Sequence, residues 1–157
     1  MSKSTPAEQK PERAQKIGRL SDLVGYHMRM AQVVVFQDFK ERLGNFGITP
    51  AHLGVLLVVR ENIHISQTEL SEMLKMDRSA LVGVIDKMEA NGWVERGKTE
   101  GDRRRNALKL TGKGEGMLTE IWAGVLDHEA HVTGRLSAEE KKQLMNLLKK
   151  IGMQKPA

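Results

Sequence analysis

Residues 65–110 of the chain read ISQTELSEMLKMDRSALVGVIDKMEANGWVERGKTEGDRRRNALKL. The stretch predicts two short helices. The first begins at the capping box Ser66-Gln67-Thr68-Glu69, in which a hydroxyl and a carboxylate three residues apart bond the backbone of the first turn. Asp77 caps the second, and Asn91-Gly92 ends it, since glycine readily adopts the left-handed conformation that closes a helix. Two short helices joined by a tight turn are typical of a helix-turn-helix.

A β-hairpin is predicted directly after the second helix. Residues 93–96 and 107–110 alternate like two strands, and the polar, glycine-containing segment 97–106 forms a long tip. In such a winged unit the second helix lies in the major groove of DNA, and the amino-terminal N–H groups of that helix favour phosphate. An arginine of the tip can enter the narrow minor groove, and Asp102 can hold a neighbouring arginine in place by a bidentate pair. The tip arginines are Arg103, Arg104 and Arg105.

Helices are also predicted on both sides of the winged unit. Apolar residues recur at three- and four-residue spacing from about Ala14 to Leu43, and Thr49-Pro50 opens a shorter helix. Thr111 and Ser137 begin the last two helices. A winged unit of roughly 65 residues does not need the long helices to fold, so we expect a twin chain to bury their apolar faces. The face of the last helix consists of Leu144, Leu147, Leu148 and Ile151.

The expected fold is therefore mainly α with a small β-hairpin wing (α+β): a winged helix-turn-helix with N- and C-terminal dimerisation helices. The expected boundaries are 1–13 for a mobile N-terminal tail, 14–47 for a dimerisation helix, 48–112 for the winged helix-turn-helix DNA-binding domain, 113–152 for the C-terminal dimerisation helices, and 153–157 for a tail.

Composition agrees with this interpretation. The chain has 157 residues, of which 39% are hydrophobic and 29% are charged, as in an ordinary folded domain. The net charge is +5, and basic residues concentrate between Arg96 and Lys113. There are no cysteines, which excludes disulfides and thiolate chemistry. No apolar run of 18 residues and no apolar block after Lys3 is present, so we expect a cytoplasmic, nucleoid-associated protein.

Enzymatic function is not expected. The sequence shows no nucleophile–base pair, no phosphate-binding glycine loop and no metal cluster, so no catalytic residue, cofactor or metal is predicted. His128 and His131 lie three residues apart on a predicted helix but lack a third ligand with suitable spacing. We therefore expect these two histidines at the surface or at a dimer contact.

An architectural DNA-binding protein with little sequence preference remains an alternative. Ala80, Val82 and Gly83, on the predicted outward face of the second helix, carry no hydrogen-bonding side chains. Base recognition would then depend on few residues, and DNA shape would contribute more.

Several linked motifs resemble the MarR family of winged helix-turn-helix regulators. The resemblance covers residues 15–151 in element order and is strongest from 48 to 114. It implies a dimer in which the first helix and the last two intertwine, and a small anionic, often aromatic ligand that releases the DNA. The motifs are Thr49-Pro50-Ala51-His52-Leu53, Ile65 to Leu70, Asp77-Arg78-Ser79, Asp86 to Gly92, Asp102-Arg103-Arg104 and Leu108-Lys109-Leu110-Thr111.

The resemblance also implies roles for individual residues. Arg104 would enter the minor groove and Asp102 would position it. The segments 25–29 and 77–82 look similar to regulators that sense an aromatic acid or its coenzyme A thioester, so we expect a repressor released from a pseudo-palindromic operator by such a ligand. The DNA-contacting candidates are Ser66, Gln67, Thr68, Lys75, Arg78, Ser79, Ala80, Lys87, Arg103, Arg104 and Arg105. The ligand-binding candidates are His27, Met30, Val34, His52 and Trp122, of which Trp122 is otherwise expected in the core.

Overall fold

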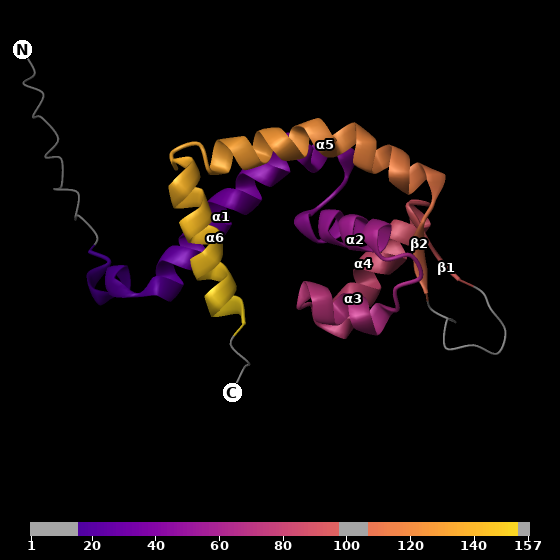
Figure 1. Ribbon diagram of the computed structural model, residues 1–157, viewed down its shortest axis with the longest axis horizontal. Coiled ribbons are helices and arrows are strands. Elements are labelled where there is room, and N and C mark those ends of the chain that lie inside the picture. Colours follow the sequence, from indigo (N-terminus) through magenta and orange to yellow (C-terminus); the bar gives the residue numbers. More distant parts are fainter. Residues whose placement is uncertain (1–15, 98–106, 154–157) are drawn as a thin grey trace, which may run out of the picture. The chain divides into compact units, whose positions relative to one another are not determined.

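The computed structural model describes residues 16–97 and 107–153, so all of the expected wing tip except Gly97 lies outside this range. The chain divides into two units, one up to Val33 and one from Val34 onward. The mainly helical fold with one small hairpin is confirmed (Figure 1). Its elements are η1 (Gly18–Asp22), α1 (Val24–Leu43), η2 (Gly44–Phe46), α2 (Pro50–Glu61), α3 (Gln67–Leu74), α4 (Arg78–Ala90), β1 (Val94–Arg96), β2 (Leu108–Leu110), α5 (Gly112–Val132) and α6 (Ala138–Gly152).

The expectation that the first long helix runs from about Ala14 is wrong for the described residues. Gly18 has a left-handed backbone with φ of 61°, and Leu23 is extended, so the short 3₁₀ helix η1 is separated from α1. The His27 ring donates a hydrogen bond from Nε2 to the carbonyl of Ser21, at 2.7 Å, across this break. The apolar spacing of the sequence continues through the break, which is why spacing alone did not reveal it.

All the predicted helix caps are present. The Thr49 hydroxyl accepts from the backbone of His52, and Pro50 occupies the first turn of α2, where its missing N–H is not needed. Gly92, with φ of 71°, follows α4 as expected. The side-chain caps of the helices from α2 to α6 are Thr49, Ser66, Asp77, Thr111 and Ser137.

The hairpin joins the helices through β2. Strands β1 and β2 are antiparallel, with Glu95 opposite Lys109, and the backbone N–H of Leu108 also bonds to the carbonyl of Ile65 at 2.9 Å. Gly114 allows α5 to start against the hairpin, because a Cβ there would lie 2.0 Å from the carbonyl oxygen of Trp93. The wing base is thus attached to α5 and to the segment that precedes α3.

One apolar core holds the winged unit together. It takes side chains from the end of α1, from α2, α3 and α4, from the hairpin and from α5. α6 contributes no buried residue. The core side chains with almost no exposed surface are Leu43, Val55, Leu56, Val59, Leu70, Leu81, Ile85, Met88, Val94, Leu108, Leu118 and Ile121.

Within the described ranges, no single helix is long and apolar enough to cross a membrane. One bent pair, Val24–Phe46 with Pro50–Glu61, meets the length and composition test only when the two are taken together.

Candidate nucleic-acid interface

Helices α3 and α4 form a helix-turn-helix. Lys75 adopts a left-handed backbone with φ of 51°, which ends α3 and starts the turn. The Ser71 hydroxyl donates to the carbonyl of Met76 at 2.8 Å and closes the turn from within. Leu81 and Ile85 of α4 are buried in the apolar core. The opposite face of α4 is therefore fixed in orientation and open to solvent.

The structure brings three of the DNA-contacting candidates together on this open side. Gln67 and Thr68 at the start of α3 and Arg78 and Val82 of α4 line one hollow of about 190 Å³. Thr68, Lys75, Arg78, Ser79, Ala80 and Lys87 are exposed, and Ser66 and Gln67 are half-buried. The remaining candidates, Arg103, Arg104 and Arg105, and the supporting Asp102 lie outside the described residues.

The start of α4 is already occupied by a carboxylate. Asp77 accepts hydrogen bonds from the Ser79 hydroxyl at 2.5 Å and from the Ser79 backbone at 2.8 Å, and a longer one from the backbone of Ala80. The hydrogen bond from the Ser79 side chain, together with the two backbone bonds, lowers the pKa of Asp77 below its usual value. The N–H groups of Ser79 and Ala80 are thus not free for phosphate, contrary to the expectation from the sequence. Arg78 and the Ser79 oxygen remain as contact groups.

The start of α3 has a similar arrangement. The Glu69 carboxylate accepts from the Ser66 hydroxyl at 2.7 Å and from the Ser66 backbone at 2.9 Å, and these bonds lower the pKa of Glu69. The Ser66 hydroxyl therefore donates its proton to Glu69 and does not have it available for a phosphate. Gln67 and Thr68 are the better placed of the three candidates at this helix start to donate to a phosphate.

An ion-pair cluster that the sequence did not suggest connects the wing base to α4. The Arg96 guanidinium of β1 lies 2.5 Å from Asp86 and also bonds Glu89. Burial acts to lower the pKa of Arg96, but Asp86 and Glu89 raise it on balance, so the arginine stays charged. The cluster fixes the wing base against α4. The single positive charge of Arg96 offsets one of the two carboxylate charges that would otherwise repel a DNA backbone.

A second cluster, centred on the buried Asp38 and His128, joins the end of α1 to α5. Asp38 accepts from Nδ1 of His128 at 2.7 Å and from Nε of Arg42 at 2.9 Å, and Arg42 also bonds Asp127. His131 lies 3.5 Å from the same carboxylate. His128 is only 4% exposed, so the expectation of a surface or dimer contact is wrong for it. Asp38 and His128 are 90 residues apart in the chain. The sequence signal for a buried partner was Asp38 itself, because it is a charged residue within the apolar stripe of α1.

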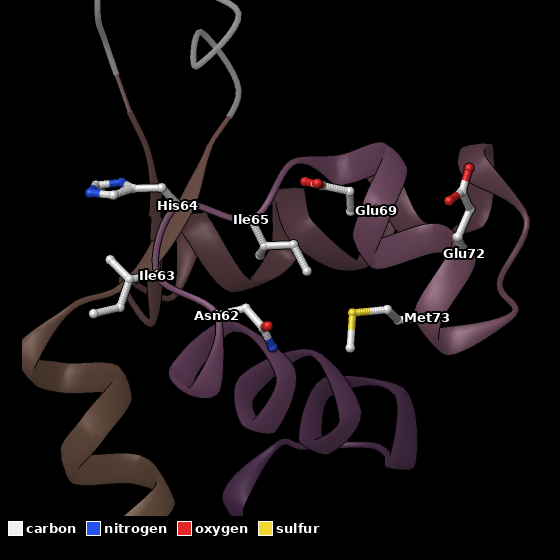
Figure 2. A pocket seen from close by; sticks show the side chains of 7 residues that line it. All are labelled: Asn62, Ile63, His64, Ile65, Glu69, Glu72 and Met73. Atoms are coloured by element: carbon white, nitrogen blue, oxygen red, sulfur yellow. The ribbon is translucent and has the colours of Figure 1, made fainter.

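Three hollows in the unit from Val34 onward differ in character. The first, of about 550 Å³, contains Glu69 and Glu72 together with Met73 of α3, and its other lining residues come from the segment between α2 and α3 (Figure 2). Its two carboxylates make it unsuited to an anion. The second, of about 430 Å³, is lined by Phe36, Phe39, Lys40, Ile48, Thr49, Pro50 and Ala51. The third, of about 420 Å³, is lined by Arg60, Leu118, Thr119 and Trp122.

The ligand-binding candidates in the unit from Val34 onward have different surroundings. Trp122 is 41% exposed beside Arg60, so its expected place in the core is wrong: it lies at the edge of the buried stripe of α5. His52 is buried, its Nδ1 accepts from the backbone of Thr49, and its ring meets that of Trp93 edge to face at 5.9 Å. Burial lowers the pKa of His52, and the charge of Lys87 lowers it further. His27, Met30 and Val34 are exposed along α1.

Comparison with known proteins agrees with this architecture. A protein assigned as a transcriptional regulator for the hcr operon of Thauera aromatica is 32% identical over 135 residues, which cover 85% of this chain and 81% of the relative. The repressor CouR bound to a 23-mer DNA duplex has 34% identity and a TM-score of 0.81 over 88% of this chain and 98% of CouR. CouR bound to p-coumaroyl-CoA has 31% identity and a TM-score of 0.81 over 89% and 99%.

Residues 46–105, which include the helix-turn-helix, match the MarR family. With the identity and coverage of these relatives, the match places the chain: it belongs to the MarR family of winged-helix transcriptional regulators.

Proposed function

We propose that this protein is a transcriptional repressor that binds a pseudo-palindromic operator as a homodimer and releases it when a small anionic ligand binds. The observation that carries the proposal is the open side of α3 and α4, where Gln67, Thr68 and Arg78 line one hollow on a helix pair held by a buried core. The DNA-bound CouR structure supports the same use of this fold. We place this activity in the cytoplasm, at the nucleoid.

Dimerisation is supported by the exposed apolar residues of α6. Leu144, Leu147, Leu148 and Ile151 recur along one face of this helix, and all are exposed in the single chain. The capping box of Ser137 and Glu140 and the lysines of the last turn favour helix formation here without burial. A face of this kind is stable in water when a second apolar surface covers it, and a second copy presents an identical one.

The ligand class follows from the second and third hollows. Phe36, Phe39 and Ile48 offer apolar walls beside the ammonium group of Lys40, and Trp122 offers an indole beside the guanidinium of Arg60. Each combination suits a planar apolar group that carries a negative charge. An aromatic acid or its coenzyme A thioester has this chemistry, and CouR was solved with p-coumaroyl-CoA.

The DNA part of the proposal can be tested by selection. Purified protein is incubated with fragmented DNA from its source at near-physiological salt, and the bound fragments are sequenced. We expect an inverted repeat whose half-sites lie about one helical turn, roughly 34 Å, apart. Uniform recovery with a steep salt dependence would instead favour the architectural alternative.

The ligand part is tested on the recovered operator by fluorescence anisotropy. Benzoate, p-coumarate and p-coumaroyl-CoA are titrated against the protein–DNA complex. We expect at least one of them to release the DNA, and Lys40→Ala or Trp122→Ala to raise the concentration required. Glu72→Ala, in the acidic hollow, is the matched control and should leave release unchanged. Failure of all three compounds to alter binding would contradict this part of the proposal.

A further inference from the structure

The open face of α4 has an unusual chemistry for reading DNA. Within α4, all of which the structure describes, Val82 is the one large apolar side chain that is exposed, with 40% of its surface free. The next residue is Gly83, and a Cβ built there would meet nothing within 4 Å. Asp86 lies one turn beyond Val82, and its carboxylate is bonded to Arg96. The centre of the face is therefore apolar, and no side chain projects from it at Gly83.

The side chains around this centre have defined hydrogen-bonding roles. The Ser79 hydroxyl donates to Asp77 at 2.5 Å, which leaves its oxygen as an acceptor. Arg78 can donate to guanine or to phosphate. Val82 can do neither, so any base that it contacts must be recognised by an apolar group.

In the major groove the C5-methyl of thymine is the apolar group that a base pair presents. Val82 also borders the hollow of about 190 Å³ between the start of α3 and α4, so the side of Val82 that faces α3 is not covered by the protein. A methyl group that projects from the floor of the groove can enter there. The bare Cα of Gly83 permits the helix to approach closely enough for the short valine side chain to reach it.

We propose that Val82 is a specificity-determining residue that selects thymine through contact with its C5-methyl group, and that Gly83 provides the close approach this contact needs. The inference rests on the proposed function, because it requires that α4 enter the major groove.

The test replaces single thymines of the recovered operator by 2′-deoxyuridine, which removes the methyl group and keeps the base pair and its O4 acceptor. Binding of the wild-type protein and of Val82→Ala is measured by fluorescence anisotropy. At one position in each half-site we expect deoxyuridine to weaken wild-type binding about fourfold, the value for one buried methyl-sized group. Val82→Ala should bind the unmodified operator more weakly, and it should no longer distinguish thymine from deoxyuridine at that position.

Val84→Ala is the matched control, because Val84 lies on the same helix but is half-buried against the core. It should retain the full preference for thymine. Circular dichroism and thermal melting confirm that each variant is folded. If deoxyuridine weakens Val82→Ala as much as wild type at every position, or weakens neither, the inference is overturned while the proposed function stands. If wild-type protein shows no specific binding to the unmodified operator, the proposed function itself fails.

Discussion

The core of the winged unit and the apolar face of α6 have the same sequence pattern, but in the single chain the core is buried and the face of α6 is exposed. Leu56 of α2 has no exposed surface, whereas Leu147 of α6 is 55% exposed. Both leucines occupy positions in a stripe with helical spacing. The pattern thus shows that a face is to be buried, but it does not show what buries it. In the first case the chain supplies the partner, and in the second we infer that another copy does.

The largest expected effect comes from the core. Leu56→Ala should lower the free energy of unfolding by about 2–5 kcal/mol, because it removes buried methyl groups and leaves a cavity in a packed site. Urea denaturation followed by circular dichroism measures it. If burial within one chain is responsible, the loss should remain the same at monomer and dimer concentrations. A loss that disappears on dilution would place Leu56 in the interface instead.

A substitution on the apolar face of α6 should weaken the dimer and leave the fold of the single chain intact. Leu147→Glu should weaken the dimer at least about hundredfold, since a two-fold interface loses two buried leucines and gains two charges. Sedimentation equilibrium measures the dissociation constant, and the helix content of the monomer should be nearly unchanged. Asn146→Glu, on the polar side of the same helix, is the control and should leave the dimer intact. An unaltered dimer in Leu147→Glu would show that α6 is not an interface element.

The buried Asp38 cluster tests whether polar burial also stabilises the core. Burial raises the pKa of Asp38, but the hydrogen bonds from His128 and Arg42 outweigh it and lower the pKa below 3.8. Ionised Asp38 therefore contributes stability that is fully present above about pH 3.8 and is lost as the pH falls through the lower folded-state pKa. Asp38→Asn should cost about 1–3 kcal/mol at pH 7.

The difference in unfolding free energy between wild type and Asp38→Asn should shrink as the pH falls below 3.8. Paired urea melts at pH 7 and pH 3 measure it. A constant difference at both pH values would mean that the charge on Asp38 contributes nothing to stability.

These cases indicate how far the sequence could predict the structure. Caps such as Ser66 and Asp77 were predictable because their partners lie within three residues. The break before α1 was not, because the left-handed backbone of Gly18 leaves the apolar spacing intact. The Asp38–His128 contact was missed since it joins residues that are distant in the chain. Trp122 was wrongly expected in the core, because apolar spacing does not show where the buried face of a helix ends.

The sequence also predicted some features of the candidate interface and missed others. Thr68, Arg78 and Ser79 are exposed, because one amphipathic period orients a whole helix, and their contact with DNA stays a prediction. The ion pairs of Arg96 could not be foreseen, since they depend on how the hairpin packs against α4. The hydrogen bond from the Ser79 hydroxyl to Asp77 also required coordinates, because the same hydroxyl could have bonded phosphate.

The smallest expected effect concerns Gly83 and sets stability against DNA contact. Glycine in the middle of an exposed helix is less favourable than alanine by about 0.5–1 kcal/mol, and a Cβ at this position meets no neighbour. Gly83→Ala should therefore raise the free energy of unfolding by about that amount, measured by urea denaturation. If the bare position serves close approach to DNA, the same variant should bind the operator more weakly although it is more stable. Equal or tighter binding would mean that the bare position has no role in the approach of α4 to the groove.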